Sequence, residues 1–302
     1  MSLLYALSEI RIPLLNTLLS VVSFLGSEVF LLLAMALCFW CYDKRLAYRL
    51  SFSFIIAGTL GHLLKVIFHM PSPVIRDSSF KPVDGILRSK TTLSFPSMRS
   101  LGIGCISITA LMKEPRIWAK IIAVIFLILV PFSQMYLGLD TLLDIGFGLI
   151  IAIVVTILVN KYMDNTATDR TQYLKFMFIL LIFPVVLLCV SLALFYNEVI
   201  AYDNMLEAVK SSGIFSALII SWYFESTYIN FSERCDRWWM QLIKIVLGLA
   251  IVFGLNAGFK SLFGLFGENF WAGDFLRYFL ITGFIFGAYP IFIKQFLSAR
   301  HI

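Results

Sequence analysis

The sequence predicts an all-α integral membrane protein, a helical bundle of about nine spans. Of its 302 residues, 60% are hydrophobic and 14% are charged, whereas a soluble domain is about 45–50% apolar and about 25% charged. The mean hydropathy is +0.90. Because so few charged side chains cannot cover this much apolar material in water, the composition excludes a soluble globular protein, a disordered chain and a nucleic-acid binder.

Apolar stretches mark the expected spans, since crossing the hydrocarbon core of a bilayer takes about 20 residues of helix. Residues 1–24 are interrupted by Glu9, Arg11 and Pro13 and are expected to form an amphipathic interfacial helix. The expected spans are 26–42, 50–69, 98–112, 117–137, 141–160, 174–196, 212–231, 240–259 and 275–297. A tight basic loop is expected at 43–49, and the proline-rich segment 70–96 is not expected to form a long helix.

A polar stretch at 161–173, KYMDNTATDRTQY, separates two groups of spans. We therefore predict a membrane core with its interfacial helix at 1–160, a linker at 161–173 and a four-span unit at 174–302. Alternate connections, beginning with 43–49, hold more than half of the Lys and Arg residues. The positive-inside rule then places these connections in the cytoplasm and segment 70–96 outside the plasma (inner) membrane.

Three polar clusters fall on this expected outer side. Lys65 ends the second span, SFPSMRS at 94–100 opens the third, and SQMYLGLDTLLD at 133–144 joins the fourth to the fifth. Polar groups at membrane depth are costly and mark candidate functional sites. Three span ends that meet at one membrane face would form a pocket for a ligand with a charged head and an apolar tail.

At these residues the chain resembles the type 2 phosphatidic acid phosphatase superfamily, whose signature is K-x-x-x-x-x-x-R-P, then P-S-G-H, then S-R-x-x-x-x-x-H-x-x-x-D. The matching positions here are Lys65 with Ser72-Pro73, then Pro96-Ser97-Met98-Arg99, then Ser133-Gln134 with Asp140 and Asp144. The resemblance covers residues 1–160 and implies a membrane phosphatase fold. It also implies that the third-motif histidine attacks phosphorus, the aspartate orients it, and the second-motif histidine protonates the leaving group.

Several catalytic positions depart from this pattern. Asp140 stands at the nucleophile position and Arg99 at the general-acid position, while Lys65, Ser97 and Asp144 are kept. The remaining phosphate-binding positions, two arginines and a glycine in the family, are Ser72, Gln134 and Met98. The candidate head-group ligands are therefore Lys65, Ser72, Ser97, Arg99 and Gln134.

The replacements change the chemistry that the site can perform. Arginine, with a pKa above about 12, is no general acid near neutral pH, whereas aspartate serves as a phosphoryl acceptor in other enzymes. Since Arg99 and Asp140 are opposite in charge, we expect them to form an ion pair. The leading hypothesis is a pseudophosphatase that binds a lipid phosphate or a partner; the alternatives are an active phosphatase or phosphotransferase and a transporter of a lipid or anionic molecule.

Polar residues elsewhere support fewer expectations. Glu225 lies inside a predicted span and could either pair with Lys260 or line a transport path. Asp140 and Asp144, expected on one helix face, supply too few ligands for a metal ion. No metal and no cofactor are expected. The expected partners are membrane lipids, with a lipid phosphate as the candidate ligand, and no nucleic acid; a protein partner is left open.

Overall fold

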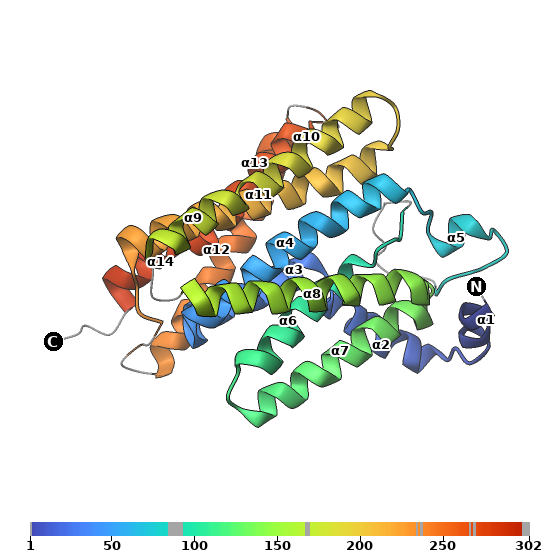
Figure 1. Ribbon diagram of the computed structural model, residues 1–302, viewed down its shortest axis with the longest axis horizontal. Helices are drawn as coiled ribbons and strands as arrows, with labels where there is room; N and C mark the ends of the chain where they lie inside the picture. The colour runs from blue at the N-terminus through green and yellow to red at the C-terminus, as the bar shows by residue number, and fades with distance from the viewer. Residues whose placement is uncertain are drawn as a thin grey trace.

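The computed structural model describes residues 2–83, 93–166, 170–233, 235, 238–265, 267 and 270–297. Within these ranges every regular element is a helix, as Figure 1 shows. Seven helices are long and apolar enough to cross a membrane, and one bent helix pair brings the number to eight. The all-α membrane class is confirmed. The span predicted at 98–112 is a helix of 16 residues, Met98–Lys113, and is too short for a full span.

The first half of the chain forms a group of helices around α4. Its elements are α1 (Ser2–Glu9), α2 (Pro13–Leu25), α3 (Glu28–Leu37), the π-helical η1 (Cys38–Tyr42), α4 (Lys44–Phe68), α5 (Pro73–Arg76), α6 (Met98–Lys113), α7 (Ile117–Leu137) and α8 (Leu142–Thr166). Helix α4 packs against α6 and α8 and, on its other side, against α10 and α11. It therefore lies between the two halves of the molecule (Figure 1).

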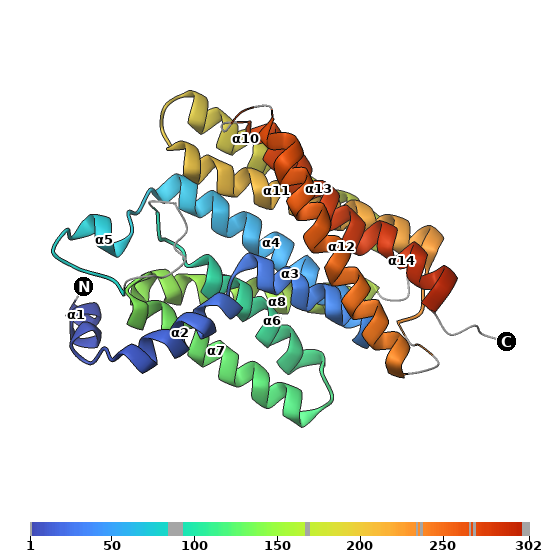
Figure 2. The same ribbon diagram turned by 180° about the vertical axis from the view of Figure 1, so that it is seen from behind.

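The second half consists of long helices and short π-helical segments. Its elements are α9 (Arg170–Leu180), α10 (Ile182–Tyr196), α11 (Tyr202–Phe224), η2 (Glu225–Ile229), α12 (Trp238–Gly264), α13 (Trp271–Gly283), η3 (Phe284–Ala288), α14 (Tyr289–Phe292) and η4 (Ile293–Leu297). Helix α11 packs against α10 and α13, and α12 packs against α13. In Figure 2, which views the molecule from behind, α12 and α13 lie in front of α11.

The N-terminal segment differs from the single interfacial helix expected at 1–24. It forms two helices, because α2 begins at Pro13, whose missing N–H is tolerated in the first turn of a helix. Helix α2 packs against α7. The axis of α2 is bent by 59° from that of the following segment, Glu28–Tyr42. The residues expected at the interface therefore reach the bundle.

Two polar stretches that were expected to be loops are largely helical. Helix α4 begins at Lys44, since the Asp43 carboxylate accepts a hydrogen bond from the Leu46 amide at 2.9 Å and caps the helix. The expected linker 161–173 is helical up to Thr166 and again from Arg170, and residues 167–169 lie outside the described ranges. Asp164 of α8 pairs with Arg49 at 2.8 Å, which gives this polar helix end a partner in the core.

Helix α11 also extends beyond its prediction, because it begins at Tyr202 where the span was expected to begin at 212. Its first turns carry the charged residues Asp203, Glu207 and Lys210, and their low hydropathy led to the prediction that the span begins after them. In the structure these turns lie against α4, and Glu207 forms an ion pair with Lys65. Packing inside the protein thus satisfies polar groups that would be costly in lipid.

Candidate functional site

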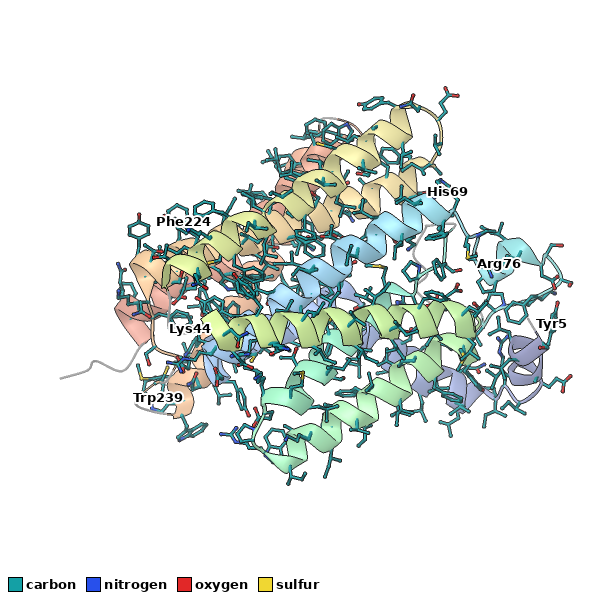
Figure 3. The ribbon with its side chains drawn as sticks, viewed as in Figure 1. Tyr5, Lys44, His69, Arg76, Phe224 and Trp239 are labelled. Atoms are coloured by element: carbon teal, nitrogen blue, oxygen red, sulfur yellow. The ribbon has the colours of Figure 1, made fainter. Side chains whose placement is uncertain are left out.

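Four helix ends meet at one end of the bundle and bring together the residues singled out by their spacing. They are the C-terminal ends of α4 and α7 and the N-terminal ends of α6 and α8. Figure 3 shows His69 and Arg76 at this end, with Lys44 and Trp239 at the opposite end. We call the polar cluster formed by Lys65, Arg76, Ser97, Arg99, Gln134, Asp140, Asp144 and Glu207 the outer site.

Ser97 lies at the centre of the outer site, where it caps the N-terminus of α6. Its hydroxyl donates a hydrogen bond of 2.5 Å to Oδ2 of Asp140, and its backbone amide donates to the Asp144 carbonyl at 3.0 Å. A Cβ at Gly148 would lie 2.7 Å from the Ser97 carbonyl oxygen. Glycine at this position therefore lets the backbone of α8 approach Ser97 closely.

Asp144 is fully buried in the first turn of α8. Its Oδ2 accepts a hydrogen bond of 2.8 Å from the Thr141 amide, while Oδ1 has no hydrogen-bond partner among the described residues. The guanidinium of Arg76 lies 3.7 Å from Oδ1. Asp140 precedes α8, so the expectation that both aspartates share a helix face is wrong.

Arg76 is a cation of the outer site that the motif comparison did not identify. It lies one helical turn after Ser72, which holds the first arginine position of the motif. Its Nε donates a hydrogen bond of 2.6 Å to the Pro71 carbonyl, which directs the guanidinium toward Asp144. In the sequence, an arginine four residues after Ser72 was the signal that could have identified Arg76. The side chain of Ser72, by contrast, makes no capping hydrogen bond.

Arg99 was expected to form an ion pair with Asp140, but the hydrogen bonds described for it go to Ser23 and Gln134. Its guanidinium donates to Ser23 Oγ at 2.6 Å and to Gln134 Oε1 at 3.3 Å. The Gln134 amide also donates to Ser23 Oγ, at 3.0 Å. Ser23 belongs to α2, which was expected to lie at the interface, so no sequence pattern predicted that Ser23 would lie here.

The carboxyl group of Asp140 is electrostatically coupled to the rest of the outer site. Burial is the main cause that raises its pKa, from 3.8 to about 6. The charge of Asp144 raises the pKa further, while the hydrogen bond from Ser97 and the positive charges of Arg99 and Lys65 lower it. The charge of Arg99 thus lowers the pKa of Asp140. The hydrogen bonds described for the two side chains go to other residues, from Arg99 to Ser23 and Gln134 and from Ser97 to Asp140.

The second half of the chain contributes a carboxylate to the outer site. Nζ of Lys65 lies 3.1 Å from Oε2 of Glu207, on α11. Next to this pair, Nε2 of His62 lies 3.1 Å from Oε1 of Glu28 and 2.8 Å from Oγ of Ser211. His62 precedes Lys65 by one turn of α4, and Ser211 follows Glu207 by one turn of α11, so the two sets of contacts are neighbours.

The described histidines are engaged outside the motif positions. Nε2 of His62 contacts Glu28 and Ser211, and Nε2 of His69 is 3.1 Å from the Val199 carbonyl oxygen. His301 lies outside the described ranges. Among the described residues, the hydrogen bonds of Ser97, Asp140 and Asp144 therefore involve no imidazole.

Glu225 and Lys260 lie away from the outer site and from each other. The Glu225 carboxylate is buried near the opposite end of α4, 3.0 Å from Nζ of Lys44, and accepts a hydrogen bond from Tyr48. Lys260 is exposed on α12. The expected pairing of Glu225 with Lys260 is therefore wrong, because α4 supplies the cation.

These features define a multispanning membrane protein with a mixed-charge site at one end of its bundle, and comparisons with known proteins give its family. A family model described as the PAP2 superfamily matches residues 46–168, and one described as the PAP2 superfamily phosphatase transmembrane extension matches 209–301. Together they match more than half of the chain. The chain belongs to the PAP2 superfamily, the type 2 phosphatidic acid phosphatases, as the motif spacing predicts.

Curated relatives include the mouse protein named sphingosine-1-phosphate phosphatase 2, which is 30% identical over 180 residues, covering 57% of this chain and 48% of the relative. The human protein of the same name is 27% identical over 140 residues, covering 44% of this chain and 34% of the relative. The chain thus matches half or less of the length of these relatives.

Two solved structures also show similarity. The Aquifex aeolicus LpxE structure is 23% identical with a TM-score of 0.48, covering 53% of this chain and 94% of that chain. The Bacillus subtilis PAP2-type phosphatidylglycerolphosphate phosphatase is 22% identical with a TM-score of 0.45, covering 56% of this chain and 86% of that chain.

Proposed function

We propose that this protein binds the phosphate-bearing head group of a membrane lipid in the outer site and does not hydrolyse it by the histidine chemistry of its superfamily. The observation that carries the proposal is the environment of Asp140. This carboxylate stands at the nucleophile position and accepts a 2.5 Å hydrogen bond from Ser97, while Lys65 and Arg99 act on it through their charges.

The cations of the outer site support the binding part of the proposal. Lys65, Arg76 and Arg99 come from α4, α5 and α6, whose ends would lie at the level of lipid head groups. Arginine binds phosphate oxygens through two parallel N–H groups, and lysine binds them as a point charge. The hydroxyl of Ser97 adds a neutral donor once Asp140 is displaced or protonated.

The replaced histidines support the non-catalytic part. Phosphoryl transfer needs a nucleophile, a proton donor for the leaving group and positive charge around the transferred phosphoryl group. Arg99, at the proton-donor position, keeps its proton near neutral pH. Without an acid in contact with the leaving oxygen, departure of an alkoxide is slow even if Asp140 attacks phosphorus.

The runner-up is an active phosphatase in which Asp140 accepts the phosphoryl group. It is favoured by the names of the relatives, which are phosphatases, and by the use of aspartate as a phosphoryl acceptor in other enzymes. It requires a proton donor that the outer site would have to recruit from water or from the substrate.

Membrane orientation is part of the same proposal. The end of the bundle opposite the outer site carries Lys44, at the start of α4 (Figure 3). It also carries three further basic residues at the ends of α4, α6 and α7, which are Arg49, Lys113 and Arg116. By the positive-inside rule this end faces the cytoplasm. The outer site would then face away from the cytoplasm at the surface of the plasma (inner) membrane and take its ligand from the outer leaflet.

A binding titration tests the proposal. The purified protein in nanodiscs is titrated with a short-chain phosphatidic acid, beside Lys65→Gln and, as a matched control, Lys120→Gln at the opposite end of the bundle. We expect saturable binding that Lys65→Gln weakens about 10-fold or more, the loss expected from one charged hydrogen bond. Equal affinity of all three proteins would contradict binding at the outer site.

A further inference from the structure

The connection between α10 and α11 forms a pocket that is separate from the outer site. A cavity of about 530 Å³ lies among the residues from Phe195, near the end of α10, to Tyr202, at the start of α11. Its volume falls in the range of small-molecule sites. Nε2 of His69, which follows α4, lies 3.1 Å from the Val199 carbonyl oxygen, so this cavity lies at the same end of the bundle as the outer site (Figure 3). We call it the loop pocket.

Three aromatic rings form part of the wall of the loop pocket. The ring of Phe195 is inclined at 61° to the ring of Tyr196, with centroids 5.5 Å apart, and at 67° to the ring of Tyr202, with centroids 5.8 Å apart. The hydroxyl of Tyr202 is buried and has no hydrogen-bond partner among the described residues, so Tyr202 contributes its ring to the wall. Aromatic rings gathered around one space are the arrangement by which proteins bind quaternary ammonium groups, because each ring face attracts positive charge.

The loop pocket also contains a carboxylate, which belongs to Glu198. This side chain is exposed at the pocket, and its backbone φ of +59° lies in the left-handed region. Glycine would adopt this conformation with less strain, so the turn alone does not account for a glutamate here. Asp203 and Asp274 act electrostatically on Tyr202, and Asp274 is paired with Arg277 at 3.1 Å. The net charge of these groups is negative, which favours a cation in the loop pocket.

The rest of the wall is apolar, which selects among cations. Val199, Ile200 and Ala201 complete the lining, so Glu198 is its one ionised side chain among the described residues. A primary ammonium group carries three N–H donors, and each of them needs an acceptor when it leaves water. A quaternary ammonium group has no N–H donor, and its methyl groups can pack directly on aromatic rings.

The depth of the loop pocket fits the charged part of a lipid head group. Tyr202 precedes Glu207 of the outer site by five residues, which is about 7.5 Å along α11. The loop pocket therefore lies farther from the hydrocarbon core than the ion pair of Lys65 with Glu207. Tyr196 is 68% exposed and Val199 is 50% exposed, so the pocket is open to the membrane surface.

We propose that the loop pocket binds a quaternary ammonium group, which the rings of Phe195, Tyr196 and Tyr202 and the carboxylate of Glu198 recognise. At this depth the source of the group is a lipid head group of the choline type. The inference goes beyond the proposed function and does not depend on it, because none of these residues belongs to the outer site.

Two ligands of equal shape separate the effect of charge from that of size. One is dihexanoyl phosphatidylcholine, and the other is its analogue with a tert-butyl group in place of the trimethylammonium group, which keeps the chains and the phosphate but loses the positive charge. Saturation-transfer NMR on the methyl protons of these groups measures the binding of each ligand to the purified protein in maltoside micelles. We expect the choline lipid to bind about 5-fold more tightly, which corresponds to about 1 kcal/mol, the value for a cation at an exposed aromatic site. Equal affinity would overturn the inference, since apolar contact alone would then account for binding.

Variants test whether the preference arises at the loop pocket. Tyr196→Leu and Glu198→Gln should each reduce the affinity ratio of the two ligands, and the double variant should bring it close to one. Tyr196→Phe keeps the ring and should keep the ratio. Tyr228→Leu removes a ring that is 66% exposed at the opposite end of the bundle and, as the matched control, should also keep the ratio. A ratio that is unchanged in the double variant would place the preference elsewhere and overturn the inference.

Two further ligands define the cation and its source. Dihexanoyl phosphatidylethanolamine carries a primary ammonium group and should bind more weakly than the choline lipid, and equal binding would refute selection of a quaternary group. Free choline should displace the choline lipid only at a higher concentration than the lipid itself. If free choline competed equally well, recognition of a quaternary ammonium group would stand, and its source would be a soluble compound.

Discussion

Asp140 is a buried carboxyl group, and its raised pKa makes the stability of the protein depend on pH. Burial raises its folded-state pKa to about 6, above the usual 3.8. The folded protein therefore holds a proton that the unfolded chain releases. The resulting stabilisation is fully present below a pH of about 4 and is lost as the pH rises through about 6.

Asp140→Asn removes this titration and leaves the size of the side chain unchanged. Between pH 5 and pH 7.5 the wild-type protein should lose about 1 kcal/mol more of its free energy of unfolding than the variant. Unfolding of both proteins in one detergent, followed at the two pH values, measures the difference. Asp203→Asn, on the first turn of α11, serves as the control. Parallel pH profiles of wild type and Asp140→Asn would contradict a raised pKa.

Arg76 is the residue that places a cation beside the buried carboxylate of Asp144. Arg76→Gln should weaken the binding of phosphatidic acid by about 10-fold, because it removes one charged contact to phosphate. It should also lower the melting temperature, since Oδ1 of Asp144 would lose its neighbouring charge. Arg45→Gln, an exposed residue at the opposite end, should do neither. An unchanged dissociation constant for Arg76→Gln would remove Arg76 from the site.

At the scale of elements, the contact between α6 and α8 sets the position of Ser97. A Cβ at Gly148 would meet the Ser97 carbonyl oxygen at 2.7 Å, whereas a Cβ at Gly146, on the same helix, would meet nothing within 4 Å. The site thus depends on backbone packing as well as on its polar side chains.

Gly148→Ala should separate the two helices and move Ser97 away from Asp140. We expect a loss of about 1–3 kcal/mol in the free energy of unfolding, the usual cost of overpacking, together with weaker lipid binding. Gly146→Ala is the matched control and should be stable, since alanine favours a helix over glycine. Equal losses in both variants would show that the close approach of α8 to Ser97 is unimportant.

The opposite end of α4 is held by a separate cluster. Nζ of Lys44 contacts Oε1 of Glu225, Oδ1 of Asn230 and the Phe231 carbonyl, each at 3.0 Å. These contacts join α4 to the π-helical η2 that follows α11. They give Glu225 a structural role that accounts for its burial inside a span.

Glu225→Gln should therefore destabilise the protein, because Lys44 would lose its charged partner, and should leave phosphatidic acid binding at the outer site unchanged. Melting temperature and dissociation constant, measured on the same preparation, test both expectations. In a transporter that used Glu225, movement of a labelled lipid across vesicles would fall in this variant while its stability stayed near that of the wild type.

At the scale of the whole molecule, α4 joins the superfamily core to the helices behind it. One face of α4 packs on α6 and α8, and the other packs on α10 and α11 (Figure 1). The Lys65–Glu207 pair lies near one end of this contact and the Lys44–Glu225 pair near the other. The second half of the chain thus contributes to the outer site and stabilises its position.

Orientation in the membrane is a property of the whole molecule and can be tested by labelling. In a background without native cysteines, Ser78→Cys at the outer-site end should react with a membrane-impermeant maleimide in intact cells. Arg116→Cys at the opposite end should react only after the cells are opened. The reverse pattern would place the outer site in the cytoplasm.

Most of the fold could be predicted from hydropathy, and the errors have a common cause. The span predicted at 117–137 coincides with α7, because its residues are apolar and partly exposed toward the expected lipid. The starts of α4 and α11 were placed too late, since both helices begin with charged residues. Lys44 and Glu207 among them form ion pairs with residues of the other half of the molecule. A hydropathy window does not distinguish a polar loop from a polar helix that is buried in protein.

The site could be predicted only where the motifs lie. Motif spacing singled out Ser97, Asp140 and Asp144, and the structure places them in contact. It did not identify Ser23 or Glu207, because these come from α2 and α11 and meet the motif residues only through long-range packing.

Release of inorganic phosphate from phosphatidic acid bound to the purified protein is the decisive measurement. It should be made beside Asp140→Ala and Ser97→Ala, under conditions where the binding titration shows that the outer site is occupied. We predict that the wild-type protein releases no more phosphate than the two variants, although it binds the lipid. Release by the wild type that disappears in Asp140→Ala would contradict binding without hydrolysis and would identify Asp140 as the phosphoryl acceptor.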